Sequence, residues 1–245
     1  ATPVMPGAGN SDLSSRTPTA ANVMWQPESS STVSEILSTP NIADIVNEIA
    51  GLAGWAAGNS MNIMFGHTTG SGVRWVEASS DGQIGMTPAL QFTTTGGAGC
   101  GGSCTTAEGI ATVTGLPDSA EEGVPSGAMY LTSSDLELVH DGADQQVVMV
   151  VFPNVEIPAG ATIASASVIF DVDEVRPGQS DADVTIALYG ERTGNAAAPS
   201  DASSDISSRT PTAAGVVWTP GASVATHEDL VTPDISAIVQ EIVGL

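Results

Sequence analysis

Basic residues are scarce in this chain, which contains five arginines and no lysine against 28 acidic residues, for a net charge of -23. Nucleic acids and anionic membrane surfaces are bound through basic patches, so the composition argues against both as partners. No apolar run approaches the roughly 18 residues that span a bilayer, and we expect no membrane insertion. The acidic excess favours a self-repelling, well-solvated surface, salt-rich surroundings, or divalent cations as counter-charges.

Recognisable catalytic patterns are missing as well. The sequence has no Ser-His-Asp order, no Cys-His pair and no phosphate-binding loop. Paired carboxylates, as used in glycoside hydrolysis, are numerous, but no single pair stands out. We therefore expect that the protein is not an enzyme.

Cysteine occurs only twice, at Cys100 and Cys104. The Gly-Gly-Ser between them would let a five-residue loop close into a disulfide. A zinc site would need two more soft ligands, which the three scattered histidines do not obviously supply. We predict a local disulfide, with a cross-link to a neighbouring chain or free thiols as the alternatives. A disulfide would place the protein outside the cytoplasm, in an extracellular or cell-surface setting.

One segment of the chain is present twice. Residues 12–52 and 205–245 align without a gap at an offset of 193, and 24 of the 41 positions are identical. Each copy has a short apolar strand signal ending in tryptophan, then a Thr-Pro pair followed by apolar residues at i, i+3, i+4 and i+7. This pattern predicts a short helix with threonine as N-cap and proline at its first position. We interpret the Thr-Pro pair and the apolar face after it as the seam between repeats, formed by Thr39, Pro40, Ile42, Ile45, Thr232, Pro233, Ile235 and Ile238.

Strand signals dominate the rest of the chain. Alternating or continuous apolar runs occur at 61–65, 73–78, 89–92, 136–139, 147–152, 164–175 and 184–190, separated by turn residues. The pattern predicts an all-β protein, a jelly-roll β-sandwich with one short capped helix per repeat, present as two incomplete copies at a 193-residue period. We expect 1–95 to be the C-terminal part of one repeat, 96–123 a Gly-rich linker with the cysteine pair, and 124–245 the N-terminal part of the next.

Several of these stretches together resemble a known group of repeats. They are 157–163 (IPAGATI), 170–172 (FDV), Trp218, 233–242 (PDISAIVQEI) and 77–82 (EASSDG). They are similar to the jelly-roll repeats of large secreted bacterial and archaeal surface proteins, such as family 96 carbohydrate-binding modules and disaggregatase-like repeats. The resemblance implies a secreted setting and binding of polysaccharide or calcium. The absence of lysine and the few aromatic residues depart from a sugar-binding pattern.

Three arrangements would complete the two partial repeats. Covalent neighbours in a tandem array could supply the missing strands, or separate subunits could complete one another by strand donation along a filament. Alternatively, 53–97 could fold back onto 124–245 as a circular permutation. Strand donation has a difficulty, because donor and acceptor would each bring a copy of the duplicated segment to one domain.

Acidic pairs are the best ligand candidates in the sequence. Asp135 and Glu137 lie two apart on one strand face, and Asp171 and Asp173 repeat the pattern. Carboxylates in this spacing can share Ca²⁺. In the sandwiches that this chain resembles, calcium often lies beside the first strand, and the resemblance therefore implies a calcium site at Asp135 and Glu137, joined by Glu77 and Asp81.

Two functions fit this sequence. The first is a structural building block of an extracellular filament or cell-surface array, with neighbouring copies of itself as partners. The second is a carbohydrate-binding adhesion module, with polysaccharide as ligand and Trp55 and Trp75 as sugar platforms.

Overall fold

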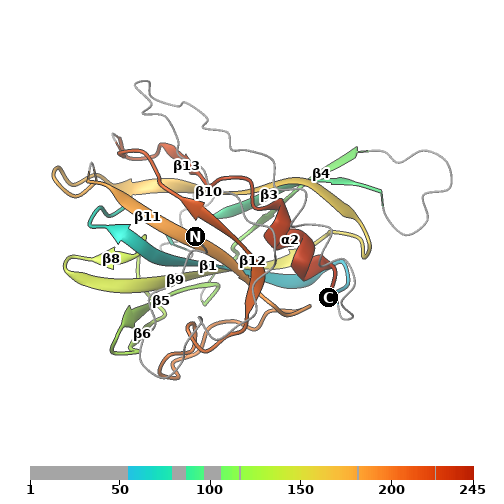
Figure 1. The fold of residues 1–245 in the computed structure, drawn as a ribbon, viewed down its shortest axis with the longest axis horizontal. Coiled ribbons are helices and arrows are strands. Elements are labelled where there is room, and N and C mark those ends of the chain that lie inside the picture. Colours follow the sequence, from blue (N-terminus) through green and yellow to red (C-terminus); the bar gives the residue numbers. More distant parts are fainter. Residues whose placement is uncertain (1–54, 79–86, 97–105, 116, 181, 224) are drawn as a thin grey trace.

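The computed structural model describes residues 55–78, 87–96, 106–115, 117–180, 182–223 and 225–245. Over these residues the chain forms two antiparallel β-sheets that share one hydrophobic core, with a short helix at one end (Figure 1). The prediction of an all-β sandwich is confirmed. Among the described residues, no helix has the length and apolar character needed to cross a membrane.

The first sheet has seven strands, and a strand from the N-terminal part lies in its middle. The order is β12-β11-β1-β9-β5-β6, and β8 pairs with β9. The strands are β12 (Pro211–Trp218), β11 (Val184–Glu191), β1 (Asn59–Gly70), β9 (Asp144–Val155), β5 (Ser119–Val124), β6 (Met129–Tyr130) and β8 (His140–Asp141).

The second sheet has six strands and is organised around the long strand β10 (Thr162–Glu174). Its order is β4-β3-β10-β2-β7, and β13 also pairs with β10. The other strands are β4 (Thr106–Thr112), β3 (Ala89–Thr95), β2 (Trp75–Glu77), β7 (Asp135–Glu137) and β13 (Asp229–Val231). Ile169 pairs with both Ala89 and Val231, so β13 lies on the edge of β10 opposite β3.

Alternation along the strands separates the core from the outer faces. On β10, Ala166, Val168, Phe170 and Val172 are buried, as the sequence predicts. Phe170 meets Phe65 of β1 edge-to-face, with ring centroids 5.3 Å apart, which joins the two sheets. The continuous apolar run of β9 is buried on both faces, because a second apolar cluster covers its outer side.

Within the predicted linker 96–123, the described residues form strands. Strand β4 pairs with β3 along its whole length, and β5 pairs with β9. The Gly-rich and acidic composition of this range predicts a linker, but strand pairing depends on what lies beside a segment as well as on its own residues.

The strands of 59–95 and those of 119–245 belong to the same two sheets. Strand β1 lies between β9 and β11, and β2 and β3 both pair with β10. Within one chain, therefore, the structure shows the fold-back arrangement, the third of the three ways to complete the repeats.

The C-terminal copy of the duplicated segment forms one side of the sandwich, and we call residues 205–245 the C-terminal wall. It contributes β12 to the first sheet and β13 to the second, and then helix α2 (Ser236–Val243). All eight residues of α2 are buried. Ile235 and Ile238, two residues of the predicted seam, belong to the core.

The start of this helix differs from the prediction. Helix α2 begins at Ser236, three residues after Pro233, so Thr232 is not its N-cap. The Thr232 hydroxyl instead accepts a hydrogen bond from the Val168 amide of β10 at 2.8 Å. Asp234 and Gln240 accept further β10 amides, from Ala166 and Ile163. These polar side chains therefore accept hydrogen bonds from the backbone amides of β10 that lie beyond the end of β13.

Candidate metal centre

A row of acidic residues crosses the outer face of the second sheet. Glu77 on β2 pairs with Asp135 on β7, and Asp171 on β10 pairs with Asp229 on β13. The pairing of Val76 with Val172 places Glu77 beside Asp171, so the row is continuous over four strands. Like charges directly opposite one another destabilise a sheet, so this row favours a bound cation.

His227 completes the cluster from the loop before β13. Its backbone amide donates to the Val172 carbonyl at 2.7 Å, and its φ of 59° lies in the left-handed region that few non-glycine residues adopt. The Val172 amide in turn donates to the Glu228 carbonyl at 3.0 Å. These bonds hold the histidine beside Asp171, where its Nδ1 lies 2.8 Å from Oδ1 of the carboxylate.

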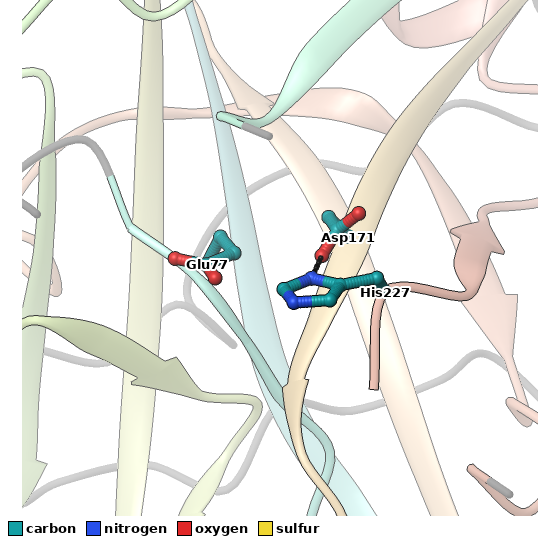
Figure 2. Close-up of side chains that lie close together, drawn as sticks. All are labelled: Glu77, Asp171 and His227. Carbon is teal, nitrogen blue, oxygen red and sulfur yellow. Dashed lines mark hydrogen bonds and ion pairs between the residues drawn. The ribbon is translucent and has the colours of Figure 1, made fainter. Parts of the chain in front are cut away.

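Glu77, Asp171 and His227 converge on one point. Each offers a ligand atom, and these atoms all lie within 4.8 Å of one another. Figure 2 shows the imidazole between the two carboxylates, with Nδ1 towards Asp171 and the other ring nitrogen on the side of Glu77. Glu77 is 1% exposed, Asp171 is half-buried and His227 is exposed, so the site opens to solvent on the histidine side.

The arginine near the cluster, Arg176, is paired with another carboxylate. Arg176 pairs with Glu174 and lies 4.7 Å above the Trp75 ring centroid. Pairing with Arg176 lowers the pKa of Glu174. The arginine is thus engaged with a carboxylate outside the Glu77–Asp171–His227 cluster.

A second acidic pair lies between the sheets' edges, where Glu137 of β7 meets Glu121 of β5. Burial, followed by hydrogen bonding and repulsion between the two carboxyls, raises the pKa of Glu121 to about 9. Burial also raises the pKa of Glu137. The Glu137 amide donates to Glu121 Oε1 at 2.9 Å. A carboxyl pair that retains a proton at neutral pH is a poor cation site.

The structure brings together only part of the predicted calcium set. Glu77 and Asp135 are neighbours, but Glu137 faces Glu121 instead. Asp81 lies outside the described residues. The sequence places Asp171 on an acidic strand face, yet it does not reveal that this face adjoins Glu77, and nothing near His227 in the sequence marks it as a ligand.

The prediction that Trp55 and Trp75 are sugar platforms has to be corrected, because both side chains are buried. Trp75 is 1% exposed beneath Arg176, and Trp55 is 7% exposed with its Nε1 donating to the Ile157 carbonyl. A sugar stacks on an exposed ring, so neither indole can serve as a platform in this fold. Cys100 and Cys104 lie outside the described residues, as do the seam residues of the first copy, Thr39, Pro40, Ile42 and Ile45.

One imidazole nitrogen and two carboxylates form a ligand set that suits a divalent transition metal ion such as Zn²⁺. Calcium prefers six to eight oxygen ligands. Comparison with known protein families, characterised proteins and solved structures finds no match for this chain. The resemblance to secreted jelly-roll repeats therefore stays a prediction.

Proposed function

We propose that this protein is a structural building block of an extracellular filament or cell-surface array, in which one copy completes the sandwich of the next. Strands β1, β2 and β3 (residues 59–95), which we call the donor strands, pair with their own chain in the structure. In the assembly, the same contacts would be made by the donor strands of the neighbouring copy. Residues 106–245 would form the acceptor.

The observation that carries this proposal is the position of the donor strands inside both sheets. Removing β1 would leave β9 and β11 without their common neighbour, and removing β2 and β3 would uncover β10 and β7. An acceptor without donor strands would expose both open edges and apolar core, which drives association with a strand donor.

The end of the C-terminal wall lies close to the beginning of the donor part. Trp55 Nε1 donates to the Ile157 carbonyl, and Gln240 of α2 donates to the Ala161 carbonyl, both at 3.0 Å. Both groups therefore meet the connection between β9 and β10, and the C-terminus lies near the first described residues in Figure 1. The end of the C-terminal wall thus lies next to Trp55 in the structure, and the first copy of the same segment, 12–52, comes just before Trp55 in the sequence.

The first copy of the duplicated segment has the same residues that attach the C-terminal wall to the rest of the sandwich. Arg209 pairs with Glu191, and Thr212 accepts the Gly190 amide at 2.9 Å. Their equivalents, together with those of Thr232 and Glu241, are identical in the first copy: Arg16, Thr19, Thr39 and Glu48. A donor that carries this segment can therefore offer a second wall at the joint between two copies.

Lengthening the connection between donor and acceptor tests the proposal. A short connection favours exchange between chains, whereas a longer one eases fold-back. Insertion of ten Gly/Ser residues after Gly99 should convert assemblies to monomers, as measured by light scattering after size-exclusion chromatography and by electron microscopy. The matched control is the same insertion after Gly142, in the exposed turn before β9, which should leave assembly unchanged. A wild-type chain that is monomeric at all concentrations would contradict the proposal.

A further inference from the structure

We propose that Glu77, Asp171 and His227 bind a divalent transition metal ion, Zn²⁺ or an ion of similar preference, which fastens the donor strands to the acceptor. The binding site itself stands on the described geometry. Only its fastening role rests on the proposed function.

The ligand chemistry favours such an ion over Ca²⁺. The cluster combines an imidazole with carboxylate oxygens, and its candidate ligand atoms all lie within 4.8 Å of one another. In one arrangement His227 binds the ion through its outer nitrogen, on the side of Glu77, while Asp171 orients the ring through Nδ1. Carboxylates often hold metal-binding histidines in this way. Solvent access on the histidine side leaves room for water to fill the remaining positions.

The local charge also favours a cation. Glu77 has Asp135 and Asp171 as its cross-strand neighbours, and Asp229 extends the row beyond Asp171. With a neutral imidazole the three proposed ligands carry two negative charges. A divalent ion would neutralise them and relieve the repulsion along the row.

The three ligands come from three separate parts of the molecule. Glu77 belongs to a donor strand, Asp171 to the central strand of the acceptor, and His227 to the C-terminal wall. An ion bound to all three would link them at one point. The first copy of the duplicated segment has Ser34 where the wall has His227. A bound ion would therefore favour the C-terminal wall over its copy in this position.

Metal titration of the full chain tests the site. Cys100 and Cys104 are replaced by serine so that thiols cannot bind the probe, and Zn²⁺ or Ca²⁺ is then added to chelator-treated protein in a calorimeter. We expect one Zn²⁺ per chain, weaker Ca²⁺ binding, and a rise in Tm with Zn²⁺. His227→Ser and Asp171→Asn should each weaken Zn²⁺ binding by about tenfold or more. Asp144→Asn, which removes an exposed carboxylate from the other sheet, should leave binding unchanged.

Three results would overturn the metal site. They are the absence of stoichiometric binding, equal binding by the wild type and His227→Ser, and loss of stability in His227→Ser that is the same with and without Zn²⁺. The last would show that His227 acts only as an ion-pair partner of Asp171. Circular dichroism confirms that each variant is folded. Assembly is measured separately by light scattering, so an intact metal site in a monomeric protein would contradict only the proposed function.

Discussion

Glu77 shows how far a single residue could be interpreted from the sequence. The predicted calcium site grouped it with Asp135, and the two residues are paired in register between β2 and β7. Its other neighbours, Asp171 and His227, are far away in the sequence. They become neighbours through the pairing of β2 with β10, and strand order is not encoded in any local pattern.

The paired carboxyls Glu121 and Glu137 make a prediction at this scale. Burial and the neighbouring carboxyl raise the pKa of Glu121 from 4.5 to about 9, so the folded protein keeps a proton that the unfolded chain releases. The free energy of unfolding should therefore fall as the pH rises between these two values. Glu121→Gln, which has no proton to release, should raise Tm at pH 8 and change it little near pH 4.5, as measured by thermal melts.

The control for this prediction is an exposed carboxyl on β4, and the rise in Tm converts to a free energy. Each kcal/mol gained at Tm corresponds to about 2–4 °C in a domain of this size. Glu108→Gln removes an exposed carboxyl of β4 and should leave the pH profile unchanged. A Glu121→Gln profile parallel to that of the wild type would show that Glu121 carries no trapped proton.

At the scale of elements, alternation and turn residues predicted most strands but not all of them. The runs at β1, β3, β9, β10 and β11 coincide with strands in the structure. Strands β4 and β5 fall mostly in the range assigned to a linker, because Gly, Thr and acidic residues give them little intrinsic strand preference, and pairing with β3 and β9 decides their conformation. The start of α2 was misplaced because Thr232 uses its hydroxyl for β10 and not for the helix.

The contact between the C-terminal wall and β10 makes the second prediction. Thr232→Val removes the acceptor of the buried Val168 amide while keeping the shape of the side chain. Leaving that amide unsatisfied should lower the free energy of unfolding by about 1–3 kcal/mol, as measured by urea denaturation. Thr112→Val, at the exposed end of β4, is the matched control and should change stability by less than about 0.5 kcal/mol. Equal effects of the two substitutions would contradict the role given to Thr232.

For the whole molecule, the duplication at an offset of 193 residues predicted two partial repeats that need strands from elsewhere to be complete, with fold-back within the chain as one of three arrangements. The structure places strands of both partial repeats in common sheets, with the second copy of the segment as a wall that touches both. The sequence could not decide whether donor strands and acceptor come from one chain, because the same residue contacts form in either case. That question concerns connectivity, so it requires a measurement that distinguishes chains.

A cysteine trap across β1 and β9 makes this distinction. Met64 and Met149 are paired in register, and paired residues of antiparallel strands have the separation that a disulfide needs. Met64→Cys and Met149→Cys are introduced together into a chain in which Cys100 and Cys104 are serine, and the assembled protein is oxidised and run on a denaturing gel. The proposed function predicts a ladder of covalent multimers that collapses to monomer on reduction. A single band of internally cross-linked monomer would show that each chain completes its own sandwich, and would contradict it.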